Sequence, residues 1–258
     1  MPGDAQHETE TNQFDNSKAY QEQEEGIKFR YLMNVGDDKG RIVAGFIAEH
    51  KPQVMVELGG YVGYSCILFG DAVRAAGGKR YFCLERNPEF AGVIMALVDL
   101  AGLSDVVKIV VGSSADSIKR LHANGALQHI DMMFLDHYKP AYTTDLKLCE
   151  HLRLVTPGTL LAADNVIKPG NPPYLRYVRS SVPEKLKQYE SSSADGDDTV
   201  GFGSRWKDQY KDREGDETLN GEIKGNPNLV YESQLVNSFE PTGVPDMRAA
   251  DTGGSHFN

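Results

Sequence analysis

A regular alternation between short apolar runs and longer segments of helical periodicity constrains the fold of this chain more than any other feature. The apolar runs are rich in Val, Ile, Leu and Phe and cover residues 54–58, 81–84, 106–111, 130–135 and 159–163. Between them, apolar residues recur at helical spacing in residues 64–76, 88–101, 115–124 and 141–154. Short buried runs separated by helices are typical of a mostly parallel sheet with helices on both faces. We therefore expect an α/β fold that binds its ligands beyond the carboxyl ends of the strands.

Composition divides the rest of the chain around this block. Residues 1–25 are polar and acidic, which predicts a disordered or loosely docked leader. Residues 26–258 are expected to form one domain, interrupted at about 184–228 by a polar surface insertion that we expect to be mobile. The insertion contains the only tryptophan, Trp206. An alternating apolar pattern returns from Leu229 and predicts a further strand.

The charge balance narrows the classes of partner. Lys and Arg total 27 against 37 Asp and Glu, which leaves a net charge of −10. Nucleic acids and anionic membrane surfaces both need a basic face, so we expect neither as a partner. The first residues lack the basic and apolar regions of a signal peptide, and the sequence lacks the ~18 consecutive apolar residues of a membrane span. These patterns predict a cytoplasmic protein.

The three cysteines, Cys66, Cys83 and Cys149, are far apart in the sequence. Their odd number and the lack of C-x-x-C spacing argue against a disulfide scaffold and against a zinc site. Reduced, mostly buried thiols are the state that we expect for them in a cytosolic protein.

Acidic residues mark the ends of most of the predicted strands. Glu57 lies within the first apolar run, Glu85 directly follows the second, Asp136 follows the fourth, and Asp164 with Asn165 follows the fifth. Any one of these acids could simply cap the helix that comes next. Acids at four of five strand ends are harder to explain by capping, and parallel strands would gather them on one rim of the sheet.

A glycine-rich segment, ELGGYVGYS at residues 57–65, joins the first strand to the next helix. Its glycines allow a sharp turn and a close approach to a cofactor. It does not fit the G-x-G-x-x-G spacing of dinucleotide sites, but it suits the loop of S-adenosylmethionine-dependent methyltransferases. Glu85, one helix and one strand later, could accept hydrogen bonds from both ribose hydroxyls of a nucleoside cofactor. A tight turn without a ligand is the alternative.

The segments DHYK at residues 136–139 and DN at residues 164–165 offer three oxygen ligands from strands that should be neighbours. Hard cations such as Mg²⁺ prefer carboxylate and amide oxygens and keep positions open for water or substrate. The sequence therefore predicts a Mg²⁺ site. Two strand-end caps beside a solvated Lys139 are the alternative.

These residues resemble the catechol O-methyltransferase family. The similarity runs from about Lys28 to Ser181 and rests on five ordered motifs: MNVGDDKG at 33–40, VELGGYVGYS at 56–65, VVGSS at 110–114, FLDHYK at 134–139 and ADNVIKPG at 163–170. The resemblance implies a Rossmann-like class I methyltransferase fold with a mostly parallel, seven-stranded sheet. It implies transfer of the S-adenosyl-L-methionine methyl group to one hydroxyl of a small-molecule catechol, with Mg²⁺.

The resemblance also assigns roles by position. Asp136, Asp164 and Asn165 would hold Mg²⁺, and Lys139 would be the general base. Glu85 would bind the ribose, and the cofactor pocket would be completed by Met33, Val35, Glu57, Gly59, Tyr61, Ser65, Arg86, Ser114, Asp136 and His137. The substrate would contact Asp136, Lys139, Asn165, Tyr31, Tyr138, Pro169 and Glu240. Glu232 competes with Glu240, because the alternation over residues 229–240 would place both on one face.

Two rival functions follow from the same residues. Another cation-dependent O-methyltransferase, such as one that acts on caffeoyl-coenzyme A, would share the metal ligands. A large acyl-CoA favours a basic entrance, which the acidic chain disfavours. A cofactor-binding regulatory protein without turnover would need neither the metal ligands nor the base. The sequence leaves open the natural catechol, the preferred ring oxygen and the oligomeric state, a monomer included.

Overall fold

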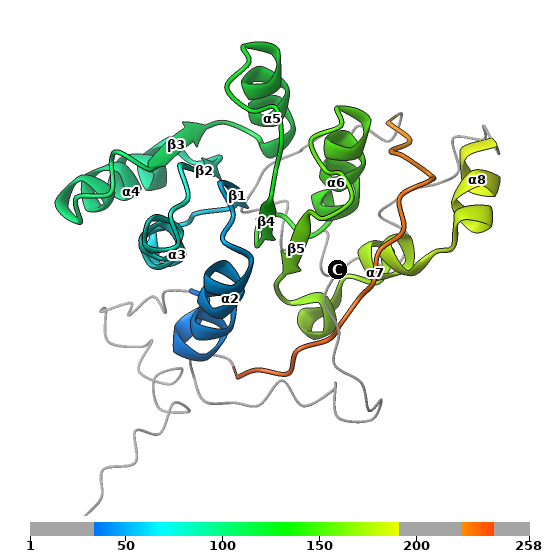
Figure 1. Ribbon diagram of the computed structural model, residues 1–258, viewed down its shortest axis with the longest axis horizontal. Coiled ribbons are helices and arrows are strands. Elements are labelled where there is room, and N and C mark those ends of the chain that lie inside the picture. Colours follow the sequence, from blue (N-terminus) through cyan, green and yellow to red (C-terminus); the bar gives the residue numbers. More distant parts are fainter. Residues whose placement is uncertain (1–33, 191–222, 240–258) are drawn as a thin grey trace, which may run out of the picture. The chain divides into compact units, whose positions relative to one another are not determined.

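The computed structural model describes residues 34–190 and 223–239, which belong to one compact unit (Figure 1). Helices and strands alternate along the chain. Their order is α2 (Gly36–His50), β1 (Val54–Leu58), α3 (Tyr64–Ala75), β2 (Arg80–Glu85), α4 (Pro88–Leu100), β3 (Val107–Val111), α5 (Ser114–Ala123), β4 (Met132–Leu135), α6 (Ala141–His151), β5 (Leu160–Ala163), the irregular turn η2 (Val166–Gly170), α7 (Pro172–Arg179) and α8 (Val182–Glu190).

The five strands form one parallel sheet in the order β3-β2-β1-β4-β5. The chain starts in the middle at β1, moves outward to β3, and then returns to β4 on the other side of β1. This change of direction between β1 and β4 creates the crevice in which α/β sheets bind ligands. All five strands coincide with apolar runs in the sequence, because strands covered on both faces need continuous apolar residues.

Two hydrophobic clusters cover the two faces of the sheet. One cluster joins the strands to α5, α6 and α7, and the other joins them to α2, α3 and α4 (Figure 1). Alternate residues of β1 divide between them, so that Val56 and Leu58 belong to the first cluster and Met55 to the second. Glu57 has the register of Met55 and therefore faces the α2–α4 layer.

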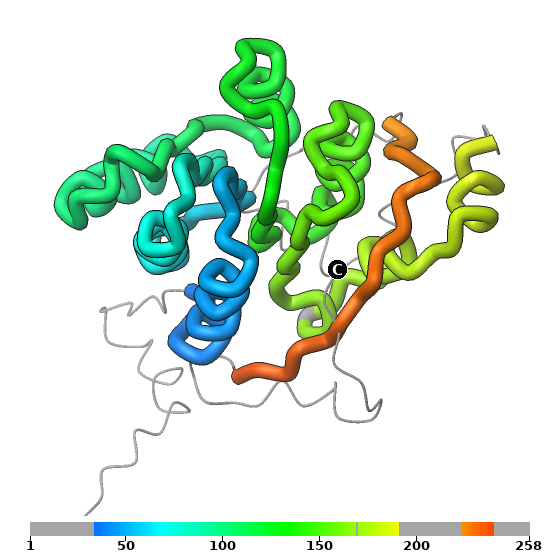
Figure 2. Tube along the Cα trace, in the orientation of Figure 1, coloured from blue at the N-terminus to red at the C-terminus, as the bar shows by residue number. Residues whose placement is uncertain are grey.

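The described residues contain five strands, so the seven-stranded sheet that the family resemblance implies is not confirmed by them. Residues 229–238 form no regular strand, and only Phe239 makes an isolated bridge. The segment passes alongside α7 in an extended course (Figure 2). Side chains hold it there: the Lys185 Nζ donates to the Leu229 carbonyl at 3.0 Å, and Tyr231 packs on the cluster beneath. The alternating apolar pattern indicates that the segment has two different faces. It does not show that another strand lies beside the segment to pair with it.

The expected insertion at 184–228 contains structured residues at both ends. Helix α8 continues to Glu190, with Lys185 only 3% exposed. At the other end, the Asn226 amide donates to Glu150 Oε2 at 2.7 Å, and the Lys224 Nζ donates to the Tyr189 carbonyl at 2.7 Å. Residues 191–222, which include Trp206, and the expected leader at 1–25 lie outside the described residues.

Replacing residues 191–222 with a short Gly/Ser linker should leave the melting temperature nearly unchanged. So few aliphatic residues lie in this polar stretch that little apolar area can be lost from the core. Extending the replacement through Pro227 should lower it by several degrees, because the buried Glu150 then loses the Asn226 amide. Thermal unfolding of the two variants beside the parent chain checks this. A large drop for the shorter replacement would show that residues 191–222 contribute to the core.

Candidate active site

The carboxyl ends of β4 and β5 bring the two predicted metal-binding aspartates together. The amide of Asp136 donates to the Leu58 carbonyl of β1 at 3.0 Å, and the amide of Asp164 donates to the Leu135 carbonyl of β4 at 2.9 Å. Both residues therefore continue the sheet ladder by one position. Their backbones are held in register, so their side chains emerge side by side at the crevice between β1 and β4.

Each of these two aspartates forms an ion pair with a lysine. Burial, reinforced by the charge of Asp164, raises the pKa of Asp136 to about 6, although Lys139 and Lys39 oppose the rise. Lys139 Nζ lies 2.9 Å from Asp136 Oδ1, and Lys39 Nζ lies 2.8 Å from Asp164 Oδ1. Each carboxylate thus already faces a cationic group. Two adjacent carboxylates offer the oxygen atoms that a hard cation prefers, and a bound cation would compete with these ammonium groups for them.

Asn165 is the third expected oxygen ligand. Its backbone has φ of 57°, in the left-handed region that Asn tolerates better than most residues. The backbone N–H of Asn165 donates to Asp164 Oδ1 at 2.7 Å, and this hydrogen bond fixes the position of the Asp164 carboxylate. Two carboxylates and one side-chain amide match the preference of Mg²⁺, and the described residues here offer it no competing thiolate or imidazole pair.

Lys139 is 5% exposed, which contradicts the alternative of a solvated strand-end lysine. Besides Asp136, its Nζ donates to the Tyr142 hydroxyl at 2.6 Å, and that hydroxyl donates to the Leu135 carbonyl at 2.7 Å. The Asn171 side chain donates to the Lys139 carbonyl at 2.8 Å. These contacts hold the amine at the rim of the sheet, next to the paired aspartates.

Glu85 clamps the glycine-rich loop. Its Oε2 accepts from the amides of Gly60 at 3.1 Å and Tyr61 at 2.8 Å, and its Oε1 accepts from the Asn87 amide at 2.8 Å. At Gly59, φ is 89° and an added Cβ would lie 2.6 Å from the Asp136 carbonyl oxygen, so only glycine fits. The loop therefore runs between the acid that ends β2 and the aspartate that follows β4.

Ser114 and His137, two expected cofactor residues, are joined by a residue that the sequence analysis missed. Asp145 Oδ2 lies 2.9 Å from His137 Nε2 and accepts from the Ser114 hydroxyl. The His137 ring also stacks on Tyr142, with centroids 4.9 Å apart. Asp145 and Tyr142 lie inside the helix expected at 141–154, where periodicity assigns a face but no partner, and their polarity on a buried face was the available signal. Lys39 lies in α2, a helix that the sequence analysis did not predict.

The other expected site residues are placed as follows. Val35 precedes α2, Ser65 lies in the first turn of α3, Arg86 directly follows β2, and Tyr138 is half-buried between Asp136 and Lys139. Tyr31, Met33 and Glu240, together with the side chain of Pro169, lie outside the described residues. Glu232 is exposed.

A pocket opens beside Asp164, one of the paired aspartates. Its walls are mainly apolar and come from α2, the ends of β4 and β5, and residues 234–238, while Lys39, Asp164 and Asn165 supply its polar end. An apolar pocket with a few convergent polar groups is the usual form of a small-molecule site.

Comparison with known proteins agrees with this geometry. A family model described as a methyltransferase domain matches residues 56–166, a range that includes the loop, Glu85 and all three expected metal ligands. A curated catechol O-methyltransferase from Sus scrofa is 42% identical over 147 residues, which cover 57% of this chain and 78% of the relative. The chain belongs to the catechol O-methyltransferase family. The catechol O-methyltransferase of Mus musculus is 41% identical over 161 residues, or 62% of this chain.

The chain spans 60% of the length of the mouse member of the family and 56% of the bovine one. A crystal structure of a protein from Klebsiella pneumoniae that is assigned as an O-methyltransferase has a TM-score of 0.50 and 20% identity, and the match covers 87% of this chain and 81% of that one. This likeness, with the parallel sheet, confirms the Rossmann-like α/β fold predicted from the sequence. None of the described helices combines the length and apolar character needed to cross a bilayer.

Proposed function

We propose that this protein is a catechol O-methyltransferase, which transfers the methyl group of S-adenosyl-L-methionine to one hydroxyl of a catechol with the help of Mg²⁺. The observation that carries the proposal is the buried Lys139 amine beside Asp136, which itself faces Asp164. In this proposal, Lys139 is the proton acceptor and lies next to the ligands of a hard cation. A protein that only bound the cofactor would need neither feature.

The residues at the carboxyl ends of β4 and β5 fit a Mg²⁺ ion by their donor chemistry. Asp136, Asp164 and Asn165 would hold it, and Lys39 would give up its ion pair with Asp164. When bound, Mg²⁺ supplies a Lewis acid that two adjacent catechol oxygens can chelate and that lowers the pKa of a hydroxyl. This requirement for adjacent oxygens selects a vicinal diol over a simple phenol.

Lys139 would act as the general base. In its neutral amine form, its Nζ would accept the proton of the reacting hydroxyl and become an ammonium, while the Tyr142 hydroxyl and the Asn171 side chain keep the lysine in place. The mainly apolar walls of the neighbouring pocket would hold the catechol ring and exclude water. Exclusion of water helps because an anion that attacks a sulfonium disperses charge.

The cofactor would lie across the switch point between β1 and β4. Glu85 would accept from the ribose hydroxyls, and the Asp145-linked pair of His137 and Ser114 would border the pocket. The glycine loop allows close approach of the methionine part. Holding both reactants in contact can contribute up to ~7–11 kcal/mol to catalysis.

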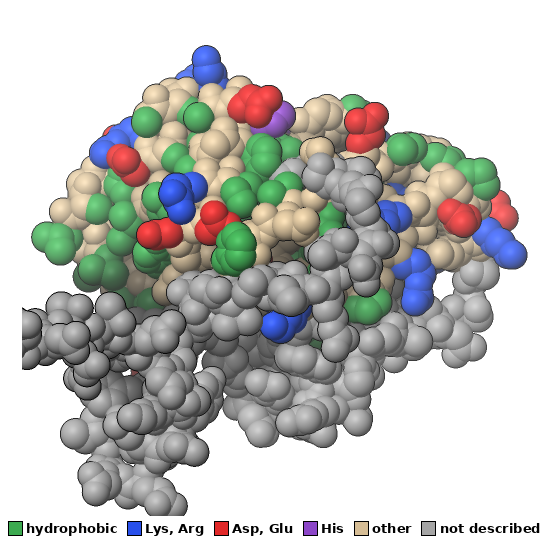
Figure 3. Space-filling model, turned by 90° about the horizontal axis from the view of Figure 1, so that it is seen from below, with side chains coloured by type: hydrophobic (Ala, Val, Ile, Leu, Met, Phe, Trp, Pro, Cys, Tyr) green, Lys and Arg blue, Asp and Glu red, His purple; other side chains and the backbone are tan. Residues whose placement is uncertain are grey.

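The alternative function, O-methylation of an acyl-CoA substrate, is less well supported. On the face shown in Figure 3, the described residues carry acidic and basic side chains interspersed with hydrophobic ones. Polyanionic acyl-CoA would favour a continuous basic patch. We also propose a cytoplasmic location, on the ground that all three cysteines are free and buried thiols.

Incubation with S-adenosylmethionine, Mg²⁺ and a simple catechol should give the mono-O-methylated product. EDTA in excess should abolish turnover, and Mg²⁺ added back should restore it, because the ligand set is all oxygen. Product formation is measured by chromatography, with phenol as the matched substrate that lacks the second oxygen. Turnover that survives exhaustive chelation, or equal rates with phenol, would contradict the proposed metal chelation.

Glu85→Gln should weaken the affinity for S-adenosylmethionine by ~1.5–3 kcal/mol, because a neutral amide replaces the charged acceptor of the ribose hydrogen bonds. It should also lower the melting temperature slightly, since the amides of Gly60 and Tyr61 lose part of their acceptor. Calorimetric titration measures the affinity. Glu89→Gln, at an exposed acid in the first turn of α4, is the control and should behave as wild type. Unchanged affinity in Glu85→Gln would place the ribose contact elsewhere.

A further inference from the structure

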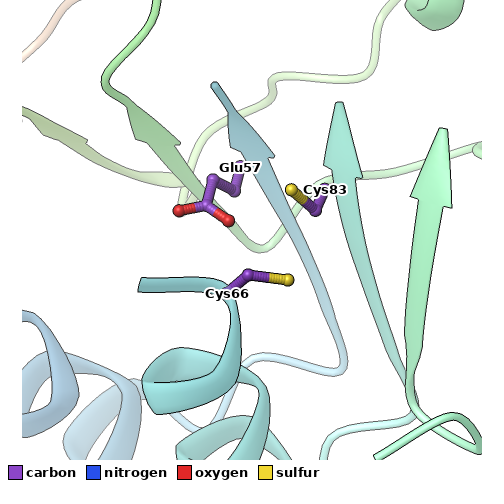
Figure 4. Close-up of side chains that lie close together, drawn as sticks. All are labelled: Glu57, Cys66 and Cys83. Atoms are coloured by element: carbon purple, nitrogen blue, oxygen red, sulfur yellow. The ribbon is translucent and has the colours of Figure 1, made fainter. Parts of the chain in front are cut away.

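A second cluster of metal-ligating side chains lies beneath the glycine-rich loop. Figure 4 shows Glu57, Cys66 and Cys83 turned toward one another from β1, α3 and β2. Each contributes one ligand atom, and these atoms all lie within 4.8 Å of one another. All three residues are 0% exposed. Cys66 and Cys83 are far apart in the sequence, so no metal-binding motif with a short spacing predicts the cluster.

The backbone explains why these side chains meet. Glu57 and Cys83 are paired residues of the parallel strands β1 and β2, so their side chains leave the same face of the sheet. Cys66 is the third residue of α3, which packs on that face. The ligands therefore sit on rigid elements and not on loops, as a preorganised site requires.

One carboxylate oxygen of the cluster has no hydrogen-bond partner among the described residues. Glu57 Oε2 accepts from the Tyr81 hydroxyl at 2.7 Å, whereas Oε1 is buried and has no hydrogen-bond partner among the described residues. Burial raises the pKa of Glu57 to about 7, although hydrogen bonds with the side chains of Ser65, Tyr81 and Cys83 act to lower it. Buried polar atoms nearly always have a partner, so an orphaned carboxylate oxygen beside two thiols needs an explanation.

We propose that Glu57, Cys66 and Cys83 bind one soft divalent cation, Zn²⁺ or Cd²⁺, at a site separate from the Mg²⁺ ligands. Thiolates select such ions over Mg²⁺, and three protein ligands leave the fourth tetrahedral position for water. Binding gives Glu57 Oε1 its missing partner. The two thiol protons, and that of Glu57 where it is protonated, leave to solvent as the ion enters.

Occupation of this site should also weaken cofactor binding, a consequence that rests on the proposed function. An added Cβ at Gly60 would lie 2.3 Å from Cys83 Sγ, so the loop rests directly on the cluster. An ion that repositions Cys83 and engages Glu57 would therefore alter the loop that faces the cofactor. Direct metal binding, measured without cofactor, is independent of this consequence and of the proposed activity.

The first experiment titrates the reduced, cofactor-free protein with Cd²⁺ in excess Mg²⁺ and follows the ultraviolet thiolate-to-cadmium charge-transfer band. Cadmium bound at Asp136 and Asp164 gives no such band, so the signal reports the thiols alone. We expect one Cd²⁺ per chain, release of about two protons, and competition by Zn²⁺. Cys66→Ala and Cys83→Ala should each weaken binding by at least ~100-fold, beyond the 10–100-fold typical of losing a mere outer partner.

Cys149→Ala is the matched control, because Cys149 is equally buried but belongs to the cluster on the opposite face of the sheet. It should retain the full band. No band in the wild type, or a band that persists in Cys66→Ala, would overturn the proposal. If a variant fails to fold, the wild type alone suffices: Zn²⁺ should slow alkylation of Cys66 and Cys83 in mild denaturant but not that of Cys149, as mapped by mass spectrometry. Equal protection of all three thiols, or none, would refute the site.

Discussion

Replacing Lys139 with alanine should lower kcat on an ordinary catechol at neutral pH by about 10²–10⁴-fold, the usual range for loss of a general base. The affinities for S-adenosylmethionine and Mg²⁺ should persist, since neither needs the amine. The loss should shrink at high pH and with acidic substrates such as nitrocatechols, because these ionise without a base. Steady-state kinetics over a pH series with both substrates provides the measurement.

The structure adds a control for this experiment. Lys139 is buried against Tyr142 and paired with Asp136, so its removal also disturbs packing and charge. Lys139→Met keeps the apolar stem and removes only the amine, and it should lose as much kcat as the alanine variant. Full activity in Lys139→Met would refute the base assignment and leave metal-assisted ionisation as the mechanism. Recovery in Met but not in Ala would show that packing, and not proton transfer, explains the loss.

Asp164→Ala should abolish turnover and weaken Mg²⁺ binding at least ~100-fold, because a direct carboxylate ligand is lost. Affinity for S-adenosylmethionine should stay close to wild type, since Asp164 faces Lys39 and the pocket and not the glycine loop. Isothermal titration with each ligand separates the two effects. Lost cofactor binding in a folded variant would contradict the metal role.

Asp131→Asn is a matched control at the amino ends of the strands, opposite the expected metal site. Its carboxylate accepts from the Gln53 and Val54 amides at the start of β1, so its loss should affect stability and leave the Mg²⁺ affinity unchanged. In the wild type, Mg²⁺ affinity should fall as the pH drops through about 6, because burial raises the pKa of Asp136 to about 6 and protons then compete for its oxygens. A flat affinity between pH 5 and 7, on either side of that pKa, would exclude Asp136 as a ligand.

The sequence by itself determined the elements of the sheet and the edge at which the site lies. Val54–Leu58 and Met132–Leu135 are nearly continuous apolar runs, and a strand buried on both faces needs that composition. Asp136 and Asp164 directly follow such runs, so a parallel sheet must bring them to one rim. These inferences hold because strand period and burial are properties of neighbours along the chain.

Only the tertiary structure decided which distant groups meet. Lys39 reaches Asp164 from α2, Asp145 links Ser114 to His137, and Lys185 donates to the Leu229 carbonyl. The meeting of Cys66 with Cys83 depends on strand order and helix packing in the same way. Periodicity along the chain identifies a buried face, but the partner across that face, and the dielectric environment that shifts the pKa of Asp136, arise only when the layers pack.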